Sequence, residues 1–93
     1  MTPPKTPRYT LQFKRAPEKL LNRLPRELVQ RLTKAIDNLA INPRPRGVEK
    51  MEGYDYLYRI RVGDWRIIYA IEDDQLIVLV IEIGHRSDVY RNY

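Results

Sequence analysis

The most regular hydrophobic pattern in the chain lies between Pro25 and Asn42. Apolar residues recur there every three or four positions and form one stripe of a helix: Leu28, Val29, Leu32, Ala35, Ile36, Leu39 and Ala40. Pro25 suits the first helical position, where its missing N–H has no partner to lose. Asn42 and Pro43 end the helix, because the residue before a proline is pushed out of helical geometry. A shorter helix is expected to start at Pro17. Its apolar positions are Leu20, Leu21 and Leu24.

Alternation of apolar and polar residues predicts strands on both sides of these helices. Residues 8–14 alternate and place Tyr9, Leu11 and Phe13 on one side. After a basic loop at 44–53, three more strands are expected at 56–62, 65–72 and 75–84, with tight turns at 63–64 and 73–74. The order of strand, two helices and three strands predicts an α+β domain. A helical hairpin should pack on one face of a largely antiparallel four-stranded sheet.

The turn at Gly63 and Asp64 determines which residues share a face of this sheet. If these two residues form the loop, Arg61 pairs with Arg66, and residues two apart in a strand point the same way. One face is then apolar and should pack against the helices: Tyr58, Ile60, Val62, Trp65, Ile67 and Tyr69. The other face carries Arg59, Arg61 and Arg66, with Ile68 beside them.

Arginines directly opposite one another destabilise a sheet, and local conflicts of this kind often mark functional sites. A solvated outer face with screened charges is the alternative interpretation. The strand at 75–84 runs back, so its end should lie near the start of the strand at 65–72. We expect His85 and Arg86 to leave the sheet there, within side-chain reach of Arg61 and Arg66. Tyr90, four residues beyond Arg86, is placed to fold over the same patch. The register of this second hairpin is left open.

Length, charge and residue counts limit the kinds of partner and binding site that the chain can have. The chain has 93 residues, which fits one domain at 1–93 with a flexible N-terminus at 1–7. Its net charge of +5 favours an anionic partner. It has no cysteine and one histidine, so no metal site or cofactor is expected. The acidic residues at 72–74 are interpreted as a turn. No stretch approaches the ~18 apolar residues of a membrane span, and we expect a cytoplasmic protein without a membrane partner.

The candidate site therefore consists of Arg59, Arg61, Arg66, His85, Arg86 and Tyr90. Guanidinium groups suit bidentate contacts with phosphate, and an aromatic ring can stack on an unpaired base. This composition favours binding of RNA and stabilisation of negative charge at a phosphate. No phosphate-binding glycine loop is present, and Ser87 lacks an orienting partner for hydrolase chemistry.

Two segments carry a resemblance to a known family. Residues 58–69 read YRIRVGDWRIIY, and residues 84–90 read GHRSDVY. They resemble the RelE branch of the RelE/ParE superfamily of bacterial toxins, which are the toxin halves of type II toxin–antitoxin pairs. The resemblance extends over about residues 9–90. It implies an endoribonuclease that cleaves messenger RNA in the ribosomal decoding site, with the ribosome, mRNA and a cognate antitoxin as partners. A toxin–antitoxin hetero-oligomer is the assembly that this implies.

The resemblance also implies roles for single residues. Arg59 and Arg61 would lie near the 2′-hydroxyl and the scissile phosphate, where the family often carries lysine. Arg66 would stabilise transition-state charge, and Arg86 would face the leaving oxygen. Tyr90 would stack on or orient the base. Since arginine is effectively never deprotonated, the choice of general acid between Arg86 and His85 stays open.

Two other functions compete with mRNA cleavage. A ParE-like toxin shares the fold but poisons DNA gyrase and does not cut RNA. A non-catalytic RNA-binding module would use the same arginines and aromatic tail. The full basic set in this chain favours the RelE-type activity over the ParE-like one, and the binding module stays open.

Overall fold

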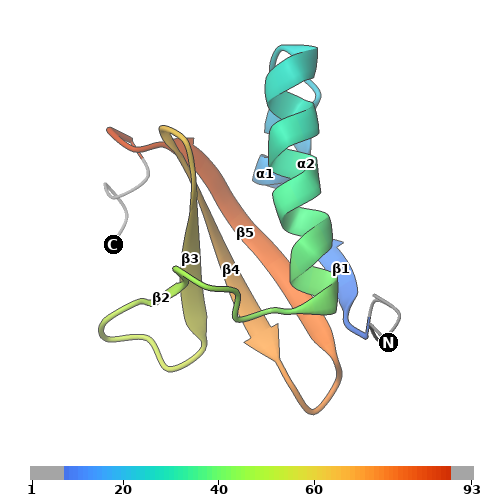
Figure 1. The fold of residues 1–93 in the computed structure, drawn as a ribbon, viewed down its shortest axis with the longest axis vertical. Helices are drawn as coiled ribbons and strands as arrows, with labels where there is room; N and C mark the ends of the chain where they lie inside the picture. The colour runs from blue at the N-terminus through green and yellow to red at the C-terminus, as the bar shows by residue number, and fades with distance from the viewer. Residues whose placement is uncertain (1–7, 89–93) are drawn as a thin grey trace.

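The computed structural model describes residues 8–88 and contains two helices and one five-stranded sheet. The elements are β1 (Thr10–Phe13), α1 (Arg15–Leu21), α2 (Arg26–Ile41), β2 (Glu49–Lys50), β3 (Leu57–Val62), β4 (Trp65–Glu72) and β5 (Ile77–His85). The sheet order is β1-β5-β4-β3-β2, with β1 parallel to β5 and every other pair antiparallel. Both helices lie on one side of the sheet (Figure 1). The predicted α+β class is confirmed, although the predicted count of four strands missed β2.

The helices begin and end close to the predicted positions. Pro25 lies just before α2 rather than inside it, and Asn42 closes the helix with an extended backbone. The apolar stripe is buried as predicted at Leu32, Ile36 and Leu39. The prediction that the first helix starts at Pro17 was wrong, because α1 begins at Arg15. Pro17 is the third residue of this helix, where a backbone N–H still needs no helical partner.

The pairing predicted for the first hairpin is confirmed. Val62 faces Trp65, Arg61 faces Arg66 and Ile60 faces Ile67. Gly63 has a φ of +60°, a value suited to glycine at the first position of a two-residue hairpin loop. The second hairpin has a four-residue connection, so Glu72 pairs with Ile77, and the register shifts by one residue between Ile68 and Tyr69. β5 therefore starts two residues later than predicted and runs one residue farther, through His85.

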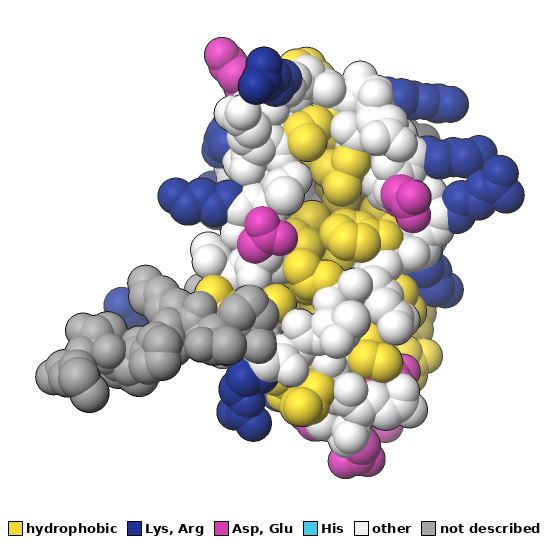
Figure 2. Space-filling model, turned by 90° about the vertical axis from the view of Figure 1, so that its right-hand side faces the viewer, with side chains coloured by type: hydrophobic (Ala, Val, Ile, Leu, Met, Phe, Trp, Pro, Cys, Tyr) yellow, Lys and Arg dark blue, Asp and Glu magenta, His cyan; other side chains and the backbone are white. Residues whose placement is uncertain are grey.

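Hydrophobic side chains are buried on both faces of the sheet. The larger cluster lies against the helices, where Leu32, Ile36 and Leu39 meet Ile60, Ile67 and Tyr69. A smaller cluster on the opposite face consists of Met51, Leu57, Ile68 and Ala70. The helix-covered core is not fully enclosed. Figure 2 shows a strip of hydrophobic side chains at the surface, on the side where α2 and β1 lie in Figure 1; Asp or Glu side chains lie next to the strip, and Lys and Arg lie at the margins of this face.

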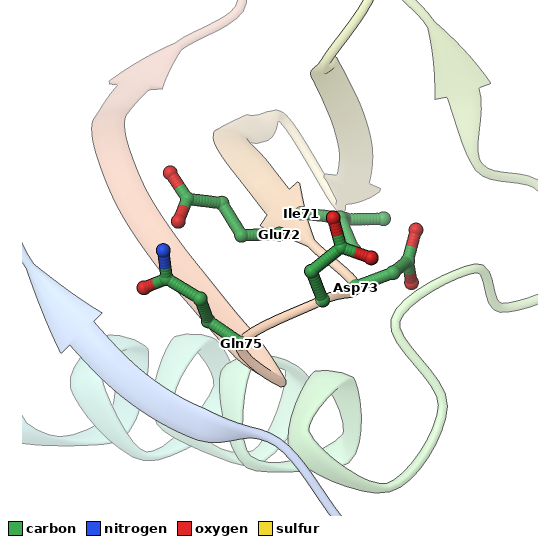
Figure 3. A pocket seen from close by; sticks show the side chains of 5 residues that line it. Ile71, Glu72, Asp73 and Gln75 are labelled. Carbon is green, nitrogen blue, oxygen red and sulfur yellow. The ribbon is translucent and has the colours of Figure 1, made fainter.

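A polar network holds the sheet end that carries the β4–β5 turn. Arg44 forms two hydrogen bonds to the carboxylate of Asp73, at 3.2 and 2.9 Å. The Tyr9 hydroxyl donates to the same carboxylate at 2.7 Å, and the Arg44 guanidinium lies over the Tyr58 ring at 5.2 Å. Figure 3 shows Asp73 at this turn beside Glu72 and Gln75. The interpretation of 72–74 as a turn is confirmed for Asp73 and Asp74, whereas Glu72 is the last residue of β4 and pairs with Ile77.

This network predicts a pH-dependent contribution to stability. Hydrogen bonds from Arg44 and Tyr9 lower the pKa of Asp73 to about 2, against ~3.9 for an unfolded aspartate. The lowered pKa stabilises the fold fully above pH ~4, and the contribution is lost as the pH falls from ~4 toward 2. Asp73→Asn should therefore reduce stability at neutral pH and flatten the fall in melting temperature between pH 4 and 2. Asp74→Asn is the control, and equal pH profiles for the two variants would contradict the assignment.

Candidate functional site

Arg61 and Arg66 face each other across β3 and β4 on the side of the sheet away from the helices. Arg66 is half-buried, and its Nη1 donates to the carbonyl oxygens of Gly63 at 3.1 Å and Trp65 at 3.0 Å. These bonds turn its guanidinium toward the hairpin loop. Arg61 is exposed, and within residues 8–88 its side chain has no hydrogen bond or ion pair. The cross-strand pair thus combines one guanidinium fixed in position with one free to meet an anion.

Arg59 has a different environment because β2 supplies a carboxylate. Glu49 pairs with Arg59 in the sheet register, and its Oε2 accepts from Arg59 Nε at 3.1 Å and Nη2 at 2.5 Å. This ion pair offsets the charge of Arg59 and holds its side chain along the sheet. Sequence reasoning missed Glu49, because residues 49–50 show no alternation that marks a strand.

Arg86 lies beside the Gly63–Asp64 loop, as the predicted convergence requires. Its backbone N–H donates to the Asp64 carbonyl oxygen at 2.8 Å, and its Nε is 4.0 Å from Asp64 Oδ1. The side chain is exposed, so this ion pair is weak. Arg31 of α2 also approaches the loop, since its Nη2 would lie 2.9 Å from a Cβ built on Gly63. Arg31 was missed because it falls on the polar face of the helical pattern.

His85 lies on the face opposite to the arginine pair, which differs from the expectation. It pairs with Trp65, and the two rings meet edge to face at 5.9 Å between centroids. Because neighbouring residues of a strand point to opposite faces, His85 and Trp65 lie on the helix side while Arg66 does not. The cause is the extra residue of β5, which keeps His85 in the sheet. Its Nδ1 is 2.9 Å from the Ser87 hydroxyl.

The remaining expectations concern Tyr90 and bound groups. Tyr90 lies outside the described residues, as does the predicted flexible segment 1–7. Among residues 8–88, no group of three or more histidine, cysteine, aspartate or glutamate side chains could hold a metal ion. In the same range, no helix is long and apolar enough to cross a membrane. The described site is therefore a set of arginines, Arg59, Arg61, Arg66 and Arg86, at the β3–β4 hairpin.

Comparison with known proteins decides the family. Residues 7–90 match the family described as ParE toxin of type II toxin–antitoxin system, parDE. The chain belongs to this toxin family. The toxin is 31% identical over 87 residues to a putative RelE-like toxin protein of Escherichia coli, an alignment covering 89% of this chain and 90% of the relative. It is also 26% identical over 88 residues to the putative toxin RelE1 of Methanocaldococcus jannaschii, covering 91% and 98%.

Solved structures place the toxin beside RelE proteins as well. It superimposes on a chain of the archaeal RelE–RelB complex from Pyrococcus horikoshii OT3 with a TM-score of 0.77 and 29% identity, covering 88% of this chain and 99% of the other. The isolated RelE toxin of E. coli gives a TM-score of 0.74 and 27% identity, with 90% and 93% covered. The resemblance to the RelE branch that the two sequence segments carry is thus confirmed.

Proposed function

We propose that this toxin is an endoribonuclease that cleaves messenger RNA in the decoding site of the ribosome. The observation that carries the proposal is the set of arginines around the β3–β4 hairpin, of which Arg61 has no side-chain partner among residues 8–88. A protein that only has to fold gains nothing from Arg61 opposite Arg66. Cleavage of RNA, by contrast, needs positive charge arranged where negative charge develops at a phosphate.

The proposed nucleophile is the ribose 2′-hydroxyl next to the scissile phosphate. Its oxygen gives up its proton to solvent and bonds to phosphorus while the bond from phosphorus to the 5′-oxygen breaks, and the departing oxygen takes up a proton from solvent. The upstream fragment then ends in a 2′,3′-cyclic phosphate and the downstream fragment in a 5′-hydroxyl. Alignment of the 2′-oxygen with the leaving oxygen supplies much of the rate. This route needs no metal ion.

The arginines divide the remaining work. Arg66 is held by two carbonyl oxygens, so its guanidinium is already oriented when the phosphorane forms. Arg61 binds the scissile phosphate, and Arg59 contributes positive charge near the 2′-hydroxyl from a position set by Glu49. Arg86 faces the leaving oxygen and acts through its charge. The proposed role of Tyr90 is to stack on the base.

His85 is proposed to act by positioning rather than as the acid. Its ring packs against Trp65 on the other face of the sheet, and its Nδ1 is engaged with Ser87. Both contacts hold the backbone that leads directly into Arg86. For the choice between His85 and Arg86, we therefore propose a structural role for His85 and stabilisation of charge at the leaving oxygen for Arg86.

Analysis of the cleaved ends tests this function. The toxin is added to pre-formed ribosome complexes on a defined mRNA, and the products are examined by mass spectrometry. We expect a 2′,3′-cyclic phosphate and a 5′-hydroxyl, with activity retained when a chelator is added after the complex is fixed. A 5′-phosphate would show that water is the nucleophile. Absence of cleavage together with inhibition of gyrase would establish the ParE-like alternative, and RNA binding without either activity would establish the binding module.

We also propose an acidic antitoxin as the partner of this toxin. Structural neighbours include RelE–RelB complexes from P. horikoshii and E. coli. The exposed hydrophobic strip, with Lys and Arg at the margins of the same face, suits an amphipathic acidic segment that folds on binding (Figure 2). Expression of the toxin alone should slow bacterial growth, and an acidic protein encoded beside it should restore growth. Abundant expression without any effect on growth would contradict both the partner and the nuclease.

A further inference from the structure

The hydrogen-bond ladder between β2 and β3 ends early and leaves part of the β3 edge uncovered. The paired residues are Glu49 with Arg59 and Lys50 with Tyr58. Beyond Lys50, one more backbone hydrogen bond follows, from the Met51 N–H to the Leu57 carbonyl oxygen at 2.9 Å. At the other end of β2, the same register would place Gly47 opposite Arg61. Gly47 has a φ of +87°, and within residues 8–88 no backbone hydrogen bond joins Arg61 to the turn at 45–48.

The direction of the Arg61 backbone follows from the bond at Leu57. Along a strand, alternate residues direct their N–H and C=O groups to the same edge. Because the Leu57 carbonyl points toward β2, the N–H and C=O of Arg61 point to that edge too, where β2 is no longer present. The sheet thus presents a backbone donor to the space between β3 and the turn at 45–48.

That space is a cavity of about 240 Å³ between α2, the 45–48 turn and β3. Ala35 and Asn38 line it from α2, and Ile60 and Arg61 line it from β3. The turn contributes Pro45, Arg46 and Gly47. A Cβ built on Gly47 would have no atom within 4 Å, so the turn leaves room beside its backbone.

The two arginines of this cavity lack the carboxylate partners that their neighbours have. Arg44 binds Asp73 and Arg59 binds Glu49. Within residues 8–88 the side chains of Arg46 and Arg61 form no ion pair and no hydrogen bond, and both are exposed. The Arg46 guanidinium beside the backbone N–H of Arg61 forms a site for an anionic oxygen.

We propose that this cavity binds a second phosphodiester of the RNA strand, next to the one that is cut. The proposal rests on the proposed nuclease function and names a subsite for its substrate. Phosphate oxygens would accept from the Arg46 guanidinium and the Arg61 N–H, and the Asn38 amide offers one more polar contact. The apolar wall of Ala35, Pro45 and Ile60 suits a ribose, which presents C–H groups beside the phosphate.

Arg61 is the reason for choosing RNA over an acidic protein side chain as the occupant. It belongs both to the cavity and to the cross-strand pair with Arg66. A single strand of RNA carries a phosphate at every nucleotide, so a strand that crosses the β3 edge at Arg61 would meet both places. Phosphate contacts of this kind position a nucleic acid without reading its sequence. The cavity should therefore affect affinity and not codon choice.

Binding can be tested without cleavage. The full-length toxin, labelled with ¹⁵N, is titrated with a short 2′-O-methyl RNA, which lacks the nucleophile, and separately with inorganic phosphate and acetate. We expect saturable shifts of the Gly47 and Arg61 amide signals with RNA and phosphate. Arg46→Ala should weaken RNA binding about tenfold, as expected for loss of a charge-assisted hydrogen bond. The matched control Arg23→Ala removes an exposed arginine from the connection before α2 and should leave affinity unchanged.

Each other result of this titration overturns the proposal. Unshifted Gly47 and Arg61 signals would show that the cavity takes no anion. Equal loss of affinity in Arg46→Ala and Arg23→Ala would show that only net charge matters. Shifts with acetate as large as with phosphate would indicate a carboxylate of a protein partner as the occupant.

Kinetics on ribosomes then separate this subsite from the proposed function. Arg46→Ala should raise KM about tenfold and leave kcat within about twofold, since its contact with the strand is the same before and during reaction, and Arg46→Lys should recover part of the loss. A fall in kcat at constant KM would contradict a binding role. If the unmodified toxin cleaves nothing while its cavity still binds the 2′-O-methyl RNA, the nuclease function fails and the RNA site stands.

Discussion

Arg66→Ala is expected to slow ribosome-dependent cleavage of mRNA by ~10²–10³-fold, as is typical for loss of one preorganised charge at a developing anion. The guanidinium of Arg66 is held by the carbonyl oxygens of Gly63 and Trp65, so it is oriented before any substrate binds. The effect should therefore fall on kcat, measured in single-turnover reactions with saturating toxin.

Arg8→Ala is the control for this experiment. Arg8 is exposed, and its backbone N–H donates to the Ala40 carbonyl oxygen, which the substitution preserves. Arg8→Ala removes one positive charge, as Arg66→Ala does, but at a position outside the β3–β4 hairpin. Arg86→Ala should resemble Arg66→Ala if the charge of Arg86 faces the leaving oxygen as proposed. If Arg66→Ala and Arg8→Ala cut equally fast, Arg66 has no part in the reaction.

Leu32→Ala should destabilise the fold by ~2–5 kcal/mol, the cost of removing a fully buried leucine and leaving a cavity. Leu32 has no exposed surface and packs in the core cluster that joins α2 to the sheet. Urea unfolding followed by circular dichroism measures this change. Thr33→Ala, on the exposed side of the same helix, should change stability by less than ~0.5 kcal/mol. Similar values for the two variants would mean that the helix packs through another face.

The parts of the fold that could be predicted are those determined by local pattern. The loop at Gly63 needs a residue that adopts positive φ, and this requirement, with the alternation of β3 and β4, predicted the pairing of Arg61 with Arg66. The stripe of α2 predicted its buried side for the same reason. These features depend on neighbours within a few residues, so they are visible in the sequence.

Features that depend on distant contacts were missed. β2 has two residues, and it is held beside β3 by the pairing of Glu49 with Arg59. No local pattern in the sequence predicts this pairing. The second hairpin combines a longer turn with a register shift at Ile68 and Tyr69, so alternation alone could not align β5 with β4. The longer turn and the register shift, together with the extension of β5 by one residue, place His85 on the face opposite to the arginines.

The place of β5 between β1 and β4 has a consequence for how the toxin folds. β5 lies between β4 and β1, and its parallel partner β1 comes from the opposite end of the described chain. The β3–β4 hairpin can form from neighbouring residues, whereas pairing of β1 with β5 must close a loop that contains every other element. Such non-local pairing carries a large entropic cost and slows folding. During synthesis, β1 and both helices leave the ribosome before the strand that completes their core exists. The nascent chain therefore completes its sheet, and gains the arginine that follows β5, only late in synthesis.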